Sequence, residues 1–170
     1  MSVIRNTVFL VVVMAAVTLL IGCAHVISKE VLKDVDPSVT FAQVAKAPDA
    51  YKGKTVLFGG AIIETKNLSN KTQVFVLQRP LDNGKKPAAG DVSEGRFIIL
   101  VPGFLDPAIY SPDRKITVAG TIVGKEVRPL GEIVYTYPLI ERRELYLWPK
   151  EEPTAAEPKV HVGVGIGVGL

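Results

Sequence analysis

The sequence predicts an all-β fold, a small closed barrel of five to six strands with one or two short helices. Three observations lead to this prediction. Apolar residues alternate with period two in several short runs between positions 54 and 148, which is the pattern of half-buried strands. Glycines interrupt these runs, and a glycine inside a strand marks a bulge, a bend or a close backbone approach. Only one segment ahead of the runs has clear helical spacing, so the expected architecture is OB-like.

The expected domain spans residues 40–149 and begins with a short helix and a long strand. Thr40 is a suitable N-cap, and the helical pattern that follows it stops before Pro48. Residues 54–66 then alternate with period two, and Gly59-Gly60 lies in the middle of the run. We expect a strand that bends at the glycine pair and serves two sides of the barrel.

A hairpin, a long loop and a buried strand are expected next. The returning strand of the hairpin covers 72–79, and the loop over 80–94 has no periodicity and is rich in turn residues. Residues 95–101 form a nearly all-apolar run that indicates a buried strand. Asp106 is placed to cap a single helical turn that begins at Pro107. The apolar underside expected for that turn consists of Phe104, Leu105, Ile109 and Tyr110.

The last strands follow a further alternating run. Residues 114–124 predict one strand, and residues 128–131 (RPLG) predict a turn after it. Two closing strands are expected over 132–138 and 139–149.

The N-terminus has the pattern of a signal peptide. Arg5 is followed by fifteen uncharged residues from Val8 to Gly22, whereas a membrane-spanning helix needs about 20 apolar residues. The run ends in Leu20, Ile21 and Gly22 directly before Cys23, a pattern that resembles the lipobox of bacterial lipoproteins.

That resemblance implies cleavage of residues 1–22 and acyl chains on Cys23, the lipid attachment site. Several acyl chains anchor a protein to a membrane stably, whereas one chain holds it only marginally. Ala24 takes the place where, in that family, Asp retains the protein at the inner membrane, so the outer membrane is the implied destination. Residues 23–39 would be a lipidated tether that holds the domain off the bilayer, although Val26, Val31, Leu32 and Val35 could pack on the edge of the domain. The alternative is an ordinary buried apolar helix with an incidental cysteine.

Residues 150–170 differ from the domain in composition. A spacer punctuated by prolines leads to VHVGVGIGVGL, in which valine, isoleucine and leucine alternate with glycine and one histidine. Strict period two predicts a strand if the tail orders, but each glycine raises the entropy lost on ordering. Disorder, pairing with a protein strand and membrane contact all stay open for this tail.

Composition excludes several functions. The net charge of +3 is too small to suggest a nucleic-acid partner. Cys23 is the only cysteine, so its lipidation leaves no thiol for catalysis or metal binding. The two histidines, His25 and His161, lie in the expected tether and tail, and we predict no catalytic residues, no metal and no cofactor. Asp106 is explained by its capping role, and no pair of carboxylates stands out as a hydrolytic site.

Three stretches of the chain resemble the Slp family of bacterial outer-membrane lipoproteins. They are YKGKTVLFGGAII at 51–63, the segment 95–125 that contains GFLDP, and YPLIERRELYLWP at 137–149. The likeness covers about 40–149 and implies a lipid-anchored protein of the Gram-negative outer membrane. It implies no catalytic residues and no settled ligand.

Two functions from different classes therefore remain. The first is a non-enzymatic envelope lipoprotein that acts through contacts with a protein partner, for which the tail could add a strand. The second is a module that binds an anionic glycan or lipopolysaccharide across the barrel face with aromatic and basic groups. Its possible contacts are Lys85, Lys86, Arg96, Tyr135, Tyr137 and Trp148, with Arg79 also beside the loop. If these aromatic residues instead fill or rim the barrel, the basic ones are a solvated loop.

Overall fold

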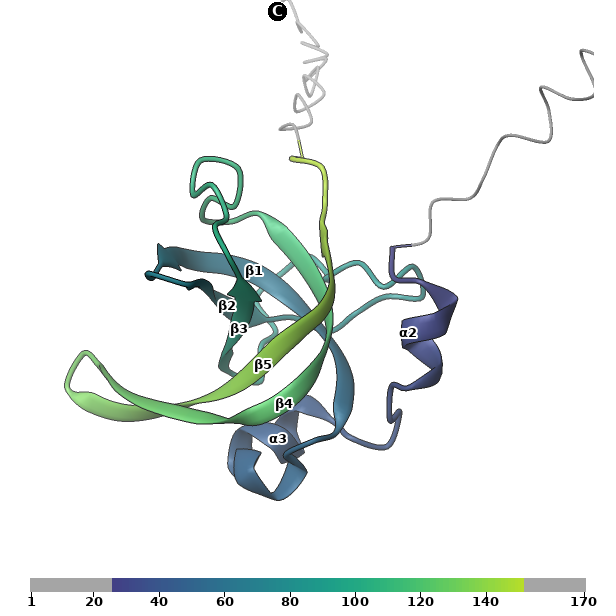
Figure 1. The fold of residues 1–170 in the computed structure, drawn as a ribbon, viewed down its shortest axis with the longest axis horizontal. Coiled ribbons are helices and arrows are strands. Elements are labelled where there is room, and N and C mark those ends of the chain that lie inside the picture. Colours follow the sequence, from purple (N-terminus) through teal and green to yellow (C-terminus); the bar gives the residue numbers. More distant parts are fainter. Residues whose placement is uncertain (1–25, 152–170) are drawn as a thin grey trace, which may run out of the picture.

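The computed structural model describes residues 26–151, which form a closed barrel with strand order β1-β2-β3-β5-β4 (Figure 1). All neighbouring strands are antiparallel except β3 and β5, which are parallel. The prediction of an all-β OB-like barrel with two short α-helices is confirmed. The strands are β1 (Thr55–Asn67), β2 (Lys71–Gln78), β3 (Arg96–Pro102), β4 (Lys115–Leu130) and β5 (Ile133–Leu147).

Strand β1 bends and serves two sides of the barrel, as its glycine pair predicts. Its first half pairs with β4 and its second half with β2, and Gly60 has a partner on both edges. A Cβ atom on Gly60 would overlap the carbonyl oxygen of Leu77 on β2. One on Gly59 would lie 2.6 Å from the Leu81 side chain. The backbones approach too closely at this bend for any larger residue.

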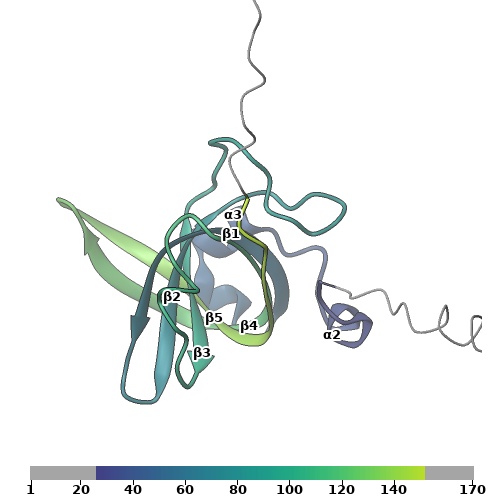
Figure 2. The ribbon, with the colours of Figure 1, turned by 90° about the horizontal axis from the view of Figure 1, so that it is seen from above.

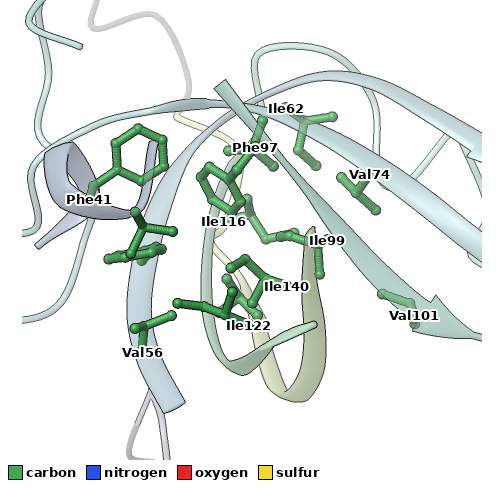
Figure 3. Close-up of a cluster of buried hydrophobic side chains, with 14 residues drawn as sticks. Phe41, Val56, Ile62, Val74, Phe97, Ile99, Val101, Ile116, Ile122 and Ile140 are labelled. Carbon is green, nitrogen blue, oxygen red and sulfur yellow. The ribbon is translucent and has the colours of Figure 1, made fainter. Parts of the chain in front are cut away.

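The barrel interior is filled by aliphatic and aromatic side chains, and helix α3 (Phe41–Lys46) closes one end (Figure 3). Thr40 and Gln43 form a reciprocal capping box at the start of this helix. The Phe41 ring packs at 5.3 Å from Phe58 and 5.7 Å from Phe97, centroid to centroid. A short 3-10 helix, η1 (Pro48–Tyr51), then leads into β1.

The two closing strands expected from the sequence are one strand, β5, and β4 is longer than predicted. The predicted turn over 128–131 is wrong, because β4 and β5 pair as far as Leu130 and Ile133. Gly131, with φ of +61°, supplies the left-handed conformation of the tight turn between them. Pro138 is tolerated inside β5 because only one edge of the strand is paired at this position. It pairs with Lys125 of β4, and the pairing of β5 with β3 begins one residue later, at Leu139.

The segment between β3 and β4 makes the predicted single helical turn, in which Tyr110 N donates to the Asp106 carbonyl oxygen at 2.9 Å. The Asp106 carboxylate accepts a hydrogen bond from Ala108 N at 2.9 Å, so the expected cap is present. Leu105 and Tyr110 pack against the core, but Phe104 and Ile109 are 71% and 53% exposed. The expected apolar underside is therefore only half formed, because one turn is too short to direct four side chains inward.

Part of the segment expected as a tether is folded onto the barrel, in line with the alternative that its apolar residues pack on the domain edge. Helix α2 (Lys29–Lys33) is capped by the Ser28 side chain, and Ile27 is buried. Val35 forms a parallel bridge with Thr55 at the start of β1. Burial of an apolar side chain and backbone pairing with the start of β1 together hold this segment on the barrel.

Candidate functional site

The six residues predicted as ligand contacts lie in two separate places. Lys85, Lys86 and Trp148 lie together, where the loop after β2 meets the end of β5. Arg96, Tyr135 and Tyr137 lie where β3 meets the outer part of β5.

The first place is a surface built around Trp148. Its indole Nε1 donates to Thr117 Oγ1 at 2.9 Å, and the Thr117 hydroxyl donates to the Lys85 carbonyl oxygen at 2.7 Å. The Lys86 ammonium lies 5.6 Å from the Trp148 ring centroid, within the range of a cation–π contact. Tyr146 packs edge-on against Trp148 at 4.8 Å. This aromatic and basic group is held by hydrogen bonds that fix the indole and the loop relative to each other.

Glu151 balances part of the positive charge on this surface. Its carboxylate lies 2.9 Å from the ammonium groups of both Lys115 and Lys86. Hydrogen bonds from Lys115 first, and from Lys86 second, lower the pKa of Glu151 to about 2. The carboxylate therefore stays ionised at any physiological pH and leaves one positive charge in excess within this group of three.

The second place is the base of a β-hairpin that packs on the outside of the barrel. Beyond Gly124, strands β4 and β5 continue as a two-stranded arm, residues 125–138, that leaves the barrel (Figure 2). The Tyr135 hydroxyl accepts a hydrogen bond from Arg96 N at 2.8 Å. Tyr137 is 4% exposed and packs edge-on against Phe75 of β2 at 5.8 Å. These aromatic residues are structural supports at the base of the arm.

Polar groups also brace the arm. Gln73 on β2 donates to Glu126 at 2.9 Å and accepts from Arg128 at 2.9 Å, and Arg128 is itself ion-paired with Glu126. The Arg128 guanidinium lies 5.1 Å from the Phe75 ring centroid. OB-type barrels bind ligands across the face of β2 and β3. Here the chain's own arm covers part of that face and buries Phe75 and Ile98.

The other side of the arm is apolar and exposed. Val127 is 53% exposed and Val134 is 76% exposed, and the pairing of Val127 with Thr136 and of Pro129 with Val134 places both valines on this side. Ile133, 59% exposed, lies near the tip on the face that also carries Tyr135. Sequence reasoning missed this surface because it ended the strands at the expected turn over 128–131. The signal was the strand-like run over 132–138, which needs a pairing partner on the other side of the turn, whereas residues 125–130 (KEVRPL) carry no clear alternation.

The described residues contain no group of three His, Cys, Asp or Glu side chains that could hold a metal ion. Across residues 26–151, no helix is both long and apolar enough to span a bilayer. The predicted lipid site Cys23, with Leu20, Ile21 and Gly22, lies outside the described residues. His25 and the tail from 152 to 170 also lie outside them.

Comparisons with known proteins identify relatives of this chain. The model of the outer membrane lipoprotein Slp family matches residues 20–164. The chain is 31% identical to the "Uncharacterized lipoprotein YeaY" of Escherichia coli K12 over 72% of its own length and 63% of the relative. It is 28% identical to the "Outer membrane protein Slp" of the same organism, over 66% of this chain and 60% of that one.

A third relative, an uncharacterized protein of Haemophilus influenzae, is 36% identical over 56% of this chain and 52% of its own. The chain thus spans between about half and two thirds of the length of these relatives. The family match covers most of the chain and includes the residues of the predicted lipobox. The chain therefore belongs to the Slp family of outer membrane lipoproteins and is a lipid-anchored protein of the Gram-negative outer membrane.

Proposed function

We propose that this lipoprotein is anchored through acyl chains on Cys23 and works as a non-enzymatic interaction module, with the arm as the surface that binds a protein partner. The anchor is supported by the order of charged start, short apolar run and lipobox, and by a family match that begins at residue 20. Cleavage before Cys23 would leave residues 23–170 as the mature chain.

The observation that carries the binding role is the exposed apolar arm. Val127 and Val134 are exposed together on one face of the projecting hairpin, and Ile133 is exposed near its tip. Single exposed apolar residues are normal on a folded domain, but a cluster marks a contact surface. In the described chain, the named strand pairings leave the outer edges of residues 125–130 and 133–137 without a neighbouring strand. An extended segment of a partner can add to such an edge through main-chain hydrogen bonds.

Site-specific crosslinking in cells tests this role. A photo-crosslinking residue at Val134 or Val127 is expected to give the same discrete protein adduct. The matched control is Leu68, which is 39% exposed at the turn between β1 and β2 and lies outside the arm. Adducts of equal yield at Leu68 and at the arm, or none at either arm position, would contradict a dedicated binding surface.

The second measurement is the adduct yield in a variant that carries a negative charge on the arm. Val134→Asp should remove most of the adduct formed at Val127, because a carboxylate buried against an apolar partner is unfavourable. The same change should leave folding stability within about 0.5 kcal/mol, since Val134 is a surface position. A full adduct yield in the Asp variant would show that the partner does not contact this face.

Anionic glycan binding is the second candidate, favoured by the position of Lys86 over Trp148. It predicts that a soluble anionic glycan binds and that Lys85→Glu with Lys86→Glu abolishes its retention. Retention that survives this charge reversal would eliminate the candidate. Neither lysine contributes to the barrel core, so the double variant should stay folded.

A further inference from the structure

The N-terminal segment is fixed to the barrel almost from its first described residue. Ser28 N donates to the Glu144 carboxylate at 2.7 Å, and Ile27 is 1% exposed. At the other end of α2, Asp34 forms an ion pair with Arg143 at 2.8 Å. Hydrogen bonds along a backbone and a buried isoleucine hold a segment far more firmly than a flexible linker is held.

This docking shortens the connection between domain and anchor. A free tether over residues 23–39 could span about 56 Å if fully extended, at up to about 3.5 Å for each residue step. With Ile27 fixed, only the four peptide steps from Cys23 remain, which reach at most about 14 Å. An acylated Cys23 lies at the headgroup level of its leaflet, so Ile27 must lie close to the membrane surface.

The direction of the segment shows which residues lie nearest to the anchor. Ser28 lies beside Glu144, whereas Val35 pairs with Thr55, which is opposite Thr121 of β4. Thr121 in turn lies opposite Glu141 of β5. Going toward its N-terminus, the segment therefore follows β5 from the level of residue 141 to that of residue 144, and so leads toward the aromatic pair at 146 and 148.

The residues found there suit a phospholipid surface. Tyr and Trp concentrate at the headgroup level of membranes, and lysines are attracted by anionic lipids. Tyr146 and Trp148 form such a pair, and the loop places Lys85 and Lys86 beside it. Lys115 joins this group through Glu151, which pairs with both Lys86 and Lys115.

We propose that this membrane-facing surface, defined by Ser28, Lys85, Lys86, Tyr146 and Trp148, rests on the phospholipid headgroups of the leaflet that holds the acyl chains. The inference rests on the proposed anchoring at Cys23. The arm lies on the side of the barrel opposite α2 in both views (Figures 1 and 2). The eleven residue steps of β5 from Glu144 to Ile133 span about 36 Å along the strand. The domain thus presents the arm away from the membrane that anchors it.

Trp148 allows a direct test because it is the only tryptophan of the chain. The full acylated chain is placed in vesicles of phosphatidylethanolamine and phosphatidylglycerol that carry a spin label at the headgroup. Trp148 emission should be strongly quenched by the lipid label and protected from aqueous iodide. The matched control moves the tryptophan to the arm with Trp148→Phe and Val134→Trp. Its emission should respond in the opposite way, with at least a several-fold weaker lipid effect.

A second variant tests the short connection. Inserting twenty flexible Gly/Ser residues between His25 and Val26 allows a root-mean-square separation of about 25 Å. If covalent reach holds the surface on the bilayer, lipid quenching of Trp148 should fall several-fold in this variant while acylation is unchanged. Quenching that does not change with the longer connection would overturn the role of the docked segment.

Intact mass measured on the same preparations distinguishes failure of the Cys23 anchor from failure of the proposed orientation. An acylated chain whose Trp148 is open to iodide, or whose arm tryptophan is quenched by lipid, overturns the orientation and leaves the anchor standing. A chain without acyl mass overturns both. If lipid does not quench Trp148 but a soluble anionic glycan protects it from iodide, the surface is a glycan site and the membrane assignment is wrong.

Discussion

Replacing Phe41 with Ala tests whether helix α3 is a necessary part of the barrel. Phe41 is 3% exposed, and its ring contacts two further buried rings, those of Phe58 and Phe97. Truncation removes about 130 Å² of buried apolar surface, which at about 25 cal/mol per Å² is about 3 kcal/mol. Two aromatic pairs at about 0.5–1 kcal/mol each add to this loss, so we expect destabilisation of about 4 kcal/mol.

Urea unfolding followed by the emission of Trp148 measures this loss. A loss of about 4 kcal/mol is a large fraction of the stability of a typical domain and would lower Tm by about 10–20 °C. Phe97→Ala, at a position that is 0% exposed inside the barrel, should cost a similar amount, and Val127→Ala on the exposed arm should cost under about 0.5 kcal/mol. If Phe41→Ala costs less than about 1 kcal/mol while Phe97→Ala costs several, α3 does not seal the barrel and the packing argument fails.

Two other changes follow from close contacts in the fold. Gly60→Ala should destabilise the barrel by about 2–3 kcal/mol or leave it insoluble, because the new Cβ would overlap the Leu77 carbonyl oxygen. Gly84→Ala, which meets only the Asp82 side chain at 3.2 Å, is the control, and equal urea midpoints for the two would refute this reading. Asp36 accepts hydrogen bonds from Ser38, the largest effect, and from Lys54, which lower the pKa of its carboxyl to about 2. A lowered pKa stabilises the folded state above the carboxyl's ordinary pKa, and this contribution is lost as the pH falls from about 4 toward 2. An NMR titration of Asp36 should show the low pKa and a rise in Lys54→Met, and an ordinary value in both proteins would contradict the contact.

The arm covers the face that OB-type barrels use for ligands and leaves other surfaces of the domain exposed. OB-type barrels commonly use the β2–β3 face for ligands, but here Tyr137 and Phe75 pack together on that face under the arm. Val127 and Val134 are exposed on the far side of the arm instead. The basic and aromatic group around Trp148 is a separate surface on the main body of the barrel. The two proposed contacts, with a membrane and with a protein partner, therefore use separate surfaces of one small domain.

Local chemistry alone was enough to predict many elements. Thr40 and Pro48 bracket α3 because an N-cap and a proline act within a few residues of themselves. Gly59-Gly60 marked the bend of β1, and alternation marked most strands, because a strand with one buried face must repeat every two residues. The lipobox likewise depends on a contiguous pattern. The sequence therefore determined the barrel class and most strand positions.

The tertiary structure decided what distant segments do to one another. Arg128 and Pro129 read as turn residues, yet they stay in β4 because the facing strand pairs with them and Gly131 makes the turn. Tyr137 could have been a ligand contact, and it is buried because Phe75, more than sixty residues earlier, lies under it. Ile27 and Ser28 could have been part of a tether, and they are fixed because the Glu144 carboxylate accepts a hydrogen bond from Ser28 N, 116 residues earlier in the chain. Such pairings depend on chain closure over long separations, and no local pattern records which partner a residue will meet.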